Sequence, residues 1–156
     1  MGLEFRLARP ADHQILEALV IDSFEPITWF KRVDERFGPL NGKNWRQRWE
    51  MRVSAGLRNQ TVLVGENAGE IAACAWGTID PQTQLGFIDI LAVARRFQGR
   101  GYGREMLRAM LRYMKERGAV HANLDCLADN DAGNGLYRSE GFEEVARSIR
   151  WHIKIP

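Results

Sequence analysis

The sequence predicts a mixed α/β fold, in which one central β-sheet of about six to seven strands carries helices on both faces. Two observations favour this class. Apolar residues first recur at helical spacing and then, from residue 61 onward, at the spacing of strands. The later segments alternate between helix and strand, which is typical of helices packed on a sheet. A chain of 156 residues is the size of one domain, so residues 1–156 are expected to fold together.

The first part of the chain is expected to hold a short strand and two helices. The strand covers residues 5–8. A helix over 12–23, which Asp12 can cap, has apolar residues at helical spacing: Ile15, Leu16, Leu19 and Val20. Residues 24–42 are expected to be irregular, because proline and glycine interrupt their aromatic residues. A helix over 43–57 follows, with apolar residues at four-residue steps: Trp45, Trp49, Val53 and Leu57.

The rest of the chain is expected to supply most of the sheet. Strands are predicted over 61–66, 71–79, 86–93, 120–127 and 143–155, and helices over 101–117 and 130–140. The turn signal Asn67-Ala68-Gly69 makes the first two of these strands a hairpin. Segment 86–93 is apolar on both faces, so it is expected to be central. In the last strand, apolar residues alternate with polar ones: Val145, Ile149, Trp151, Ile153 and Ile155.

Composition excludes several classes of protein. Hydrophobic residues make up 45% and charged residues 27%, so the chain is neither disordered nor fibrous. A net charge of +2 is too even for a dedicated nucleic-acid binder, and no apolar run is long enough to span a membrane. The start lacks the pattern of a signal peptide, so a cytoplasmic protein is expected. Cys74 and Cys126 are expected to be reduced, buried thiols, and the scattered histidines predict no metal site: His13, His121 and His152.

A glycine-alternating loop follows the expected central strand and leads directly into a helix. It consists of Gln98, Gly99, Arg100, Gly101, Tyr102, Gly103 and Arg104. Glycines allow several backbone N–H groups to approach one ligand, and the N-terminus of a helix favours an anion. With Arg95 and Arg96 close by, the segment is predicted to hold a pyrophosphate; a solvent-facing turn is the alternative. It matches neither a Rossmann fingerprint nor a Walker loop.

A second segment has a polar stripe on an expected helix. Asn130, Gly133, Asn134 and Tyr137 fall at positions i, i+3, i+4 and i+7, hence on one face. Small polar side chains suit a face that lies against a polar ligand. A glycine inside a helix costs about 1 kcal/mol relative to alanine. Close approach of a ligand explains Gly133, and a merely weak helix explains it equally well.

The two segments together resemble the GNAT superfamily of acetyl-CoA-dependent N-acetyltransferases. Gln98-x-x-Gly101-x-Gly103 matches the family's (Arg/Gln)xxGx(Gly/Ala) loop. Residues 130–142 match its pattern N-x-x-A-x-x-L-Y-x-x-x-G-F, and depart from it only at Gly133. The order of the expected elements fits this family from about residue 3 to the end, so the resemblance implies the GNAT-like twisted sheet.

The resemblance also implies a co-substrate, a mechanism and site residues. Acetyl-CoA would be held without a metal by Leu91, Ala92, Val93, Gln98, Gly99, Arg100, Gly101, Tyr102, Gly103, Arg104, Asn130, Gly133, Asn134 and Tyr137. A primary amine would attack the thioester, a strand amide near Leu91 would stabilise the oxyanion, and Tyr137 would protonate the thiolate. Asp89, a lone carboxylate in an apolar strand, is the candidate general base. A structural role for Asp89, or action through water, is equally open.

Several alternatives stay open at this point. A non-catalytic acyl-CoA-binding module on the same fold is the alternative to an enzyme. The acceptor is either a small-molecule amine or the N-terminus of a peptide or protein, and acyl groups other than acetyl are not excluded. Trp29, Phe30 and Phe37 are expected to line its pocket, whereas Trp45 and Trp49 are expected in the core. A homodimer is expected to use sheet edges or the final strand.

Overall fold

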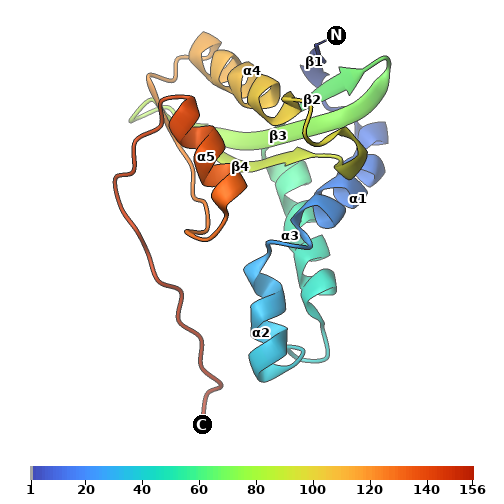
Figure 1. Cartoon of the computed structure of the whole chain (residues 1–156), viewed down its shortest axis with the longest axis vertical. Coiled ribbons are helices and arrows are strands. Elements are labelled where there is room, and N and C mark those ends of the chain that lie inside the picture. Colours follow the sequence, from blue (N-terminus) through green and yellow to red (C-terminus); the bar gives the residue numbers. More distant parts are fainter. Residues whose placement is uncertain (1) are drawn as a thin grey trace.

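A computed structural model describes residues 2–156 and shows a five-stranded mixed sheet with helices on both faces (Figure 1). The strands follow chain order across the sheet: β1 (Glu4–Leu7), β2 (Thr61–Asn67), β3 (Glu70–Asp80), β4 (Leu85–Val93) and β5 (His121–Asn123). Neighbours from β1 to β4 are antiparallel, and β5 is parallel to β4. The mixed α/β class is therefore confirmed.

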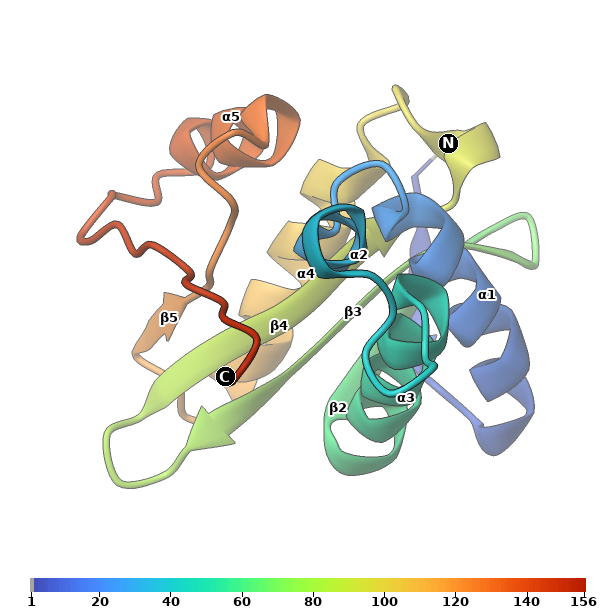
Figure 2. The ribbon, with the colours of Figure 1, turned by 90° about the horizontal axis from the view of Figure 1, so that it is seen from below.

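Helices cover the sheet on two sides and build two cores. They are α1 (His13–Phe24), α2 (Trp29–Phe37), α3 (Trp45–Asn59), α4 (Tyr102–Glu116) and α5 (Asp131–Ser139), with short 3-10 turns at Pro10–Asp12 and Arg95–Phe97. One core joins α1 and α3 to the sheet around the fully buried Trp76 and Val53. The other joins α4 to the opposite face around Met106 and Leu107. Figure 2 shows α1 and α3 on one side of β3 and α4 on the other. Across residues 2–156, no helix combines the length and apolarity needed to cross a bilayer.

A β-bulge in β4 shapes the site described below. Trp76 of β3 pairs with Ile90, but the next residue of β3, Gly77, pairs with Ile88. Asp89 is therefore an extra residue on β4. Bulges bend a strand and re-aim its side chains. From the bulge towards Val93, β5 no longer pairs with β4.

Two expectations for the first part of the chain were wrong. Residues 29–37 form α2 rather than irregular structure. The Thr28 side chain accepts a hydrogen bond from the N–H of Phe30, and Gly38 ends the helix with a φ of 74°. Asp12 does not cap α1. Its carboxylate instead accepts hydrogen bonds from the N–H of Arg9 and from the Arg6 guanidinium, so its oxygens are turned to the chain before the helix.

The sheet is also smaller than expected, with five strands rather than six to seven. The predicted strand 120–127 keeps only its first part, His121–Asn123, in β5. The predicted strand 143–155 is not paired with any described residue, although it is extended (Figure 1). Alternating apolar residues favour an extended conformation, but a strand forms only when the segment lies beside the edge of another strand. Residues 143–155 run away from the sheet that they were predicted to join.

Candidate functional site

The loop between β4 and α4 has the backbone geometry of an anion site. Gly99 and Gly101 have φ angles of 78° and 83°, which side chains other than glycine rarely tolerate. Gly101 is the N-cap of α4 and offers no side chain to the first turn. Within residues 2–156, nothing accepts a hydrogen bond from the N–H groups of Gly101, Tyr102, Gly103 and Arg104. These free donors and the helix dipole favour an anion here, as the sequence predicts.

The arginines around this loop differ in what they contact. Three of them are paired with carboxylates: Arg95 with Asp22 and Glu25, Arg96 with Glu70, and Arg104 with Glu140. The guanidinium of Arg100 lies 5.3 Å from the centre of the Phe97 ring, and no described carboxylate pairs with it. Arg104 thus contributes its N–H group to the loop while its side chain holds α5. Arg100 is the arginine whose charge is free for a ligand.

Next to the loop, β4 has an edge with free backbone groups. No described strand extends the β5 pairing along residues 88–93. The N–H of Ala94 donates to β3, so the alternation of an antiparallel ladder turns the backbone groups of Leu91 and Val93 away from β3. The carbonyl of Val93 accepts a 3.0 Å hydrogen bond from the Gln98 side chain. The N–H of Val93 and both groups of Leu91 therefore point into the opening beside β4.

Ala92 lies differently from its two neighbours. Its side chain is buried in the core between the sheet, α1 and α3, and the same alternation directs its backbone groups to β3. The sequence grouped Ala92 with Leu91 and Val93. The structure places only the latter two toward the opening.

The predicted stripe on α5 contacts the chain just before that helix. The Asn130 side chain accepts a 3.1 Å hydrogen bond from the N–H of Gly133, and the Asn134 side chain donates a 2.8 Å hydrogen bond to the carbonyl of Leu127. An added Cβ on Gly133 would lie 2.8 Å from the Asn130 amide and 3.0 Å from the Cys126 sulfur. Crowding by these two side chains is a further reason for a glycine at 133, besides the two that the sequence suggests. Asn130 and Asn134 hold α5 in place.

Tyr137 stands at the end of this stripe, packed on the α4 core. Its ring centre lies 5.7 Å from that of Phe142. Burial raises the pKa of the Tyr137 hydroxyl to about 12, and the nearby Cys126 adds to the shift. The phenol therefore keeps its proton at neutral pH. The same burial raises the pKa of the Cys126 thiol, which is half-buried rather than buried; Cys74 is buried, and both thiols are free.

Asp89, the residue added by the bulge, lies on the α3 side of the sheet. Its Oδ1 accepts a 2.7 Å hydrogen bond from Arg52, and its Oδ2 accepts a 2.8 Å bond from the Gln60 side chain. Sequence patterns contain no sign of either partner. The carboxylate is thus held by a cation and an amide, and 13% of its side chain is exposed. These contacts fit a structural role for Asp89. They would equally orient its carboxylate to act as a base through water.

The aromatic residues of α2 divide between the core and the surface. Phe30 packs against the buried Trp49, with ring centres 5.2 Å apart, so it belongs to the core rather than to a pocket. Trp45 packs on the same core, as expected. Trp29 and Phe37 instead meet the C-terminal segment. Only these two of the three predicted pocket residues lie away from the core.

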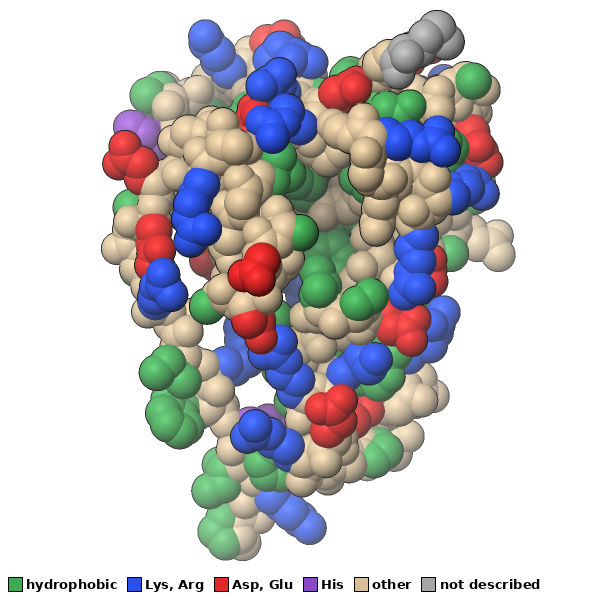
Figure 3. Space-filling view, viewed as in Figure 1, with side chains coloured by type: hydrophobic (Ala, Val, Ile, Leu, Met, Phe, Trp, Pro, Cys, Tyr) green, Lys and Arg blue, Asp and Glu red, His purple; other side chains and the backbone are tan. Residues whose placement is uncertain are grey.

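A hollow with hydrophobic side chains on its floor opens over β4, next to α5 (Figure 3). The α5 wall is fixed close to the loop: a Cβ on Gly103 would lie 3.6 Å from Leu136 and 3.7 Å from Val93. Arg32 of α2 and Asp129, just before α5, form a 2.8 Å ion pair that joins two segments distant in the sequence. Another hollow, of about 370 Å³, lies elsewhere, between α1 and α3. Across residues 2–156 there is no group of three or more potential metal ligands.

Comparisons with known proteins agree with this arrangement. The model of the Acetyltransferase (GNAT) family matches residues 24–142. N-alpha-acetyltransferase RimI of Mycobacterium tuberculosis is 40% identical over 65 residues, which are 42% of this chain and 39% of that protein. N-alpha-acetyltransferase 30 of Schizosaccharomyces pombe is 32% identical over 71 residues, which are 46% of this chain and 47% of that protein. The matched region is thus less than half the length of either relative.

A solved structure extends the likeness to the whole fold. AAC(6′)-Iy in complex with the bisubstrate analogue CoA-S-monomethyl-acetylneamine superimposes with a TM-score of 0.68 at 15% identity. The superposition covers 99% of this chain and 100% of that one. At this identity the likeness concerns the fold alone. The family model, which spans well over half of the sequence, shows that the chain belongs to the acetyltransferase (GNAT) family.

Proposed function

We propose that the protein transfers an acetyl group from acetyl-CoA to a primary amine. The observation that carries this proposal is the convergence of unused backbone donors at one opening. The N–H groups of residues 101–104 lie at one end of the opening, the free groups of Leu91 and Val93 line its β4 wall, and α5 with Tyr137 forms the opposite wall.

The residues present suit the two polar parts of acetyl-CoA. A pyrophosphate needs several donors and no side chain in the way, which is what the loop offers around Gly101. Arg100 adds a free positive charge. The amides of a pantetheine arm pair with an exposed strand edge as an added strand does, and Leu91 and Val93 offer that edge.

Three residues have an assigned role in the transfer of the acetyl group. Acetyl-CoA supplies a thioester whose carbonyl carbon is open to attack by an amine and whose sulfur leaves as a thiol. The N–H of Leu91 is the donor assigned to the carbonyl oxygen, where it would stabilise negative charge as it develops. The Tyr137 hydroxyl holds the proton assigned to the sulfur. Asp89 is the carboxylate assigned to receive the amine proton, through water because Arg52 and Gln60 occupy its oxygens.

The acceptor is proposed as a class. Two relatives are N-alpha-acetyltransferases by name, and the analogue bound to AAC(6′)-Iy contains an acetylneamine part. Both a peptide or protein N-terminus and a small amine are therefore candidates. Two unpaired cysteines agree with a reducing compartment, so we place the reaction in the cytoplasm.

Two measurements test the proposal. Calorimetry should show binding of acetyl-CoA but not of ATP or NAD at the same concentration. Thiol release should then be followed with a panel of short peptides with free N-termini, polyamines and aminoglycosides. Release that depends on one acceptor class supports the enzyme. Acetyl-CoA binding without release by any member of the panel would instead favour a non-catalytic acyl-CoA module.

A further inference from the structure

Glu140, the residue after α5, joins that helix to α4 through two arginines. Its carboxylate accepts a hydrogen bond from Arg104 and two from Arg108, at 2.7 and 3.0 Å. Only 8% of the Glu140 side chain is exposed. Across residues 2–156, no other ion pair connects α4 to this end of α5. Glu140 therefore fixes where α5 ends relative to α4.

The position of Glu140 also affects Tyr137, the residue proposed to protonate the leaving sulfur. Tyr137 lies about one turn earlier on the same helix. The N–H of Glu140 donates to the carbonyls of Leu136 and Tyr137, both at 3.1 Å. A displacement of Glu140 would therefore move the backbone that carries the phenol. Because a misplacement of about 1 Å at a reacting group can slow a reaction about a hundredfold, the contacts of Glu140 matter for the transfer.

Arg104 differs from Arg108 in where its backbone lies. The N–H of Arg104 is one of the free donors in the loop that is proposed to hold the pyrophosphate. Arg108 lies one turn further into α4, where N–H groups have partners within the helix. An anion bound at the loop would fix the backbone of the first turn. It would thus fix the backbone of the very residue whose side chain holds Glu140.

We propose that Arg104 is a positioning residue, which couples an occupied pyrophosphate loop to the placement of Tyr137 through Glu140. This inference rests on the proposed function, in which the loop binds acetyl-CoA and Tyr137 gives up the proton. The end of a helix opens more readily than its middle, so an empty loop leaves Arg104 free to move with the first turn. A filled loop fixes that turn, and Arg104 and Arg108 then hold the carboxylate together from the same face of α4. The proton donor is therefore fully in place only while the co-substrate is bound.

Hydrogen exchange of the full chain, with and without CoA, tests the coupling without catalysis. Saturating CoA should raise the protection of the α5 amides about threefold or more in the wild type, and Arg104→Gln should lose most of this gain. Arg108→Gln is the matched control. It should lower protection in the free protein but keep the gain, because its backbone lies outside the loop. Calorimetry establishes the saturating CoA concentration for each variant.

Three outcomes of this measurement would overturn the proposal. The first is an equal response of Arg104→Gln and Arg108→Gln to CoA. The second is a wild type whose α5 gains no protection. The third is a wild type whose α5 loses protection, because Arg104 has then left Glu140 for the pyrophosphate.

A double-mutant cycle tests whether Arg104 acts through Tyr137. Arg104→Gln should lower kcat about threefold or more at saturating acetyl-CoA, with the KM of the amine unchanged. Arg104→Lys should restore part of the rate, because it keeps the charge but not the forked donor. In the Tyr137→Phe background, Arg104→Gln should change kcat less than about twofold, since the group that it positions is gone. An equal loss in both backgrounds would contradict a positioning role.

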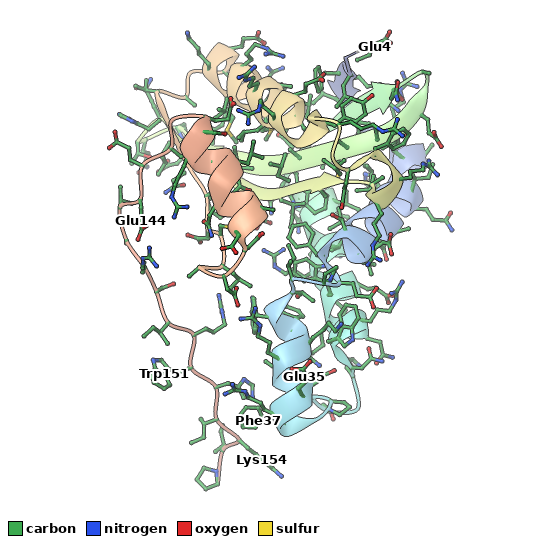
Figure 4. The ribbon with its side chains drawn as sticks, in the orientation of Figure 1. Glu4, Glu35, Phe37, Glu144, Trp151 and Lys154 are labelled. Carbon is green, nitrogen blue, oxygen red and sulfur yellow. The ribbon has the colours of Figure 1, made fainter. Side chains whose placement is uncertain are left out.

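Glu144→Gln is the control for the loss of a charge just beyond α5. Figure 4 shows Glu144 on the segment that leaves α5, away from α4. Its ion pair with Arg147 stays within that segment, so this variant should change neither the exchange of α5 nor kcat. A wild type that releases no thiol with any amine would contradict the proposed function, and the exchange measurement would still decide the coupling. A wild type that turns over, while Arg104→Gln and Arg108→Gln respond alike to CoA, would overturn the coupling alone.

Discussion

Arg52 of α3 donates a 2.7 Å hydrogen bond to the carboxylate of Asp89, the extra residue in the β4 bulge. This ion pair ties the orientation of the proposed general base to α3, the helix on the same side of the sheet. Gln60 holds the second oxygen of the carboxylate, while its own Oε1 is buried without a hydrogen-bond partner among the described residues.

Asp89→Asn should lower turnover, with little loss of stability. Asparagine keeps an oxygen for Arg52, and a flipped Gln60 could then accept a hydrogen bond from the new amide. The part-exposed ion pair itself contributes about 1 kcal/mol or less. Thermal unfolding and acetyl-CoA-saturated turnover are measured on the same sample. Reduced stability with normal turnover per folded molecule would make Asp89 structural.

Tyr137→Phe should lower turnover by about tenfold to a thousandfold, with acetyl-CoA affinity nearly unchanged. The thiol leaving group has an ordinary pKa near 8.5, so protonation helps it less than it helps a poor leaving group. Because burial raises the pKa of Tyr137 to about 12, the wild type should show no loss of rate from this group below about pH 10. Thiol release and calorimetry on one preparation check both points. Near-normal turnover removes Tyr137 from the mechanism.

Gly101→Ala should weaken acetyl-CoA binding at least tenfold, equal to about 1.4 kcal/mol. The matched control is Gly118→Ala, after the C-terminus of α4. Both glycines have left-handed φ angles, 83° and 93°, and a Cβ on either meets no atom within 4 Å. Each substitution should therefore cost about 1–2 kcal/mol of stability through backbone strain alone. If the two variants lose affinity equally, the loop is not the pyrophosphate site.

Arg100→Gln should reduce both the affinity for acetyl-CoA and its dependence on salt. Interactions between exposed charges are screened as salt rises, and Arg100 is the loop arginine without a carboxylate partner among the described residues. Arg112→Gln, on the exposed surface of α4, is the control and should change neither quantity. Titrations at low and high salt distinguish the two. A wild-type affinity that is insensitive to salt would contradict the assignment.

Glu140→Gln should loosen α5 and remove part of its acid sensitivity. The pairs with Arg108 and Arg104 hold the pKa of Glu140 below its ordinary value of 4.5. Folded protein therefore binds this proton more weakly than unfolded protein, so the stabilisation is present above pH 4.5 and is lost as pH falls below it. Hydrogen exchange of α5 between about pH 5 and 3 follows the change.

Glu144→Gln is the control for this experiment. The pKa of Glu144 is lowered in the same way by Arg147, but that pair lies within the exposed C-terminal segment, residues 143–156. Its loss should leave α5 unchanged. A wild type whose α5 amides have equal protection factors at both ends of the pH range, after correction for the pH dependence of intrinsic exchange, would show that Glu140 does not hold the helix.

Local patterns predicted much of the fold and the loop whose backbone N–H groups are free. The β2–β3 hairpin, α3 and α4 follow from periodicity and turn residues alone, and the free N–H groups at Gly101 follow from glycine placement before a helix. α2 was missed although its signals were present: Thr28 as a cap, Gly38 as a stop, and Trp29, Val33 and Phe37 at four-residue steps.

The sequence by itself determined the β2–β3 hairpin, the helices α3 and α4 and the glycine loop before α4, because these depend on neighbours a few residues away. Only the tertiary structure decided which partners the side chains of those segments contact. The bulge aims Asp89 at Arg52, and an added Cβ on Gly133 would lie 2.8 Å from the Asn130 amide and 3.0 Å from the Cys126 sulfur. The C-terminal segment, residues 143–156, has the pattern of a strand and still lies outside the sheet. A strand pattern specifies which faces are apolar, but pairing needs an open edge within reach, and that edge exists only once the whole chain has folded.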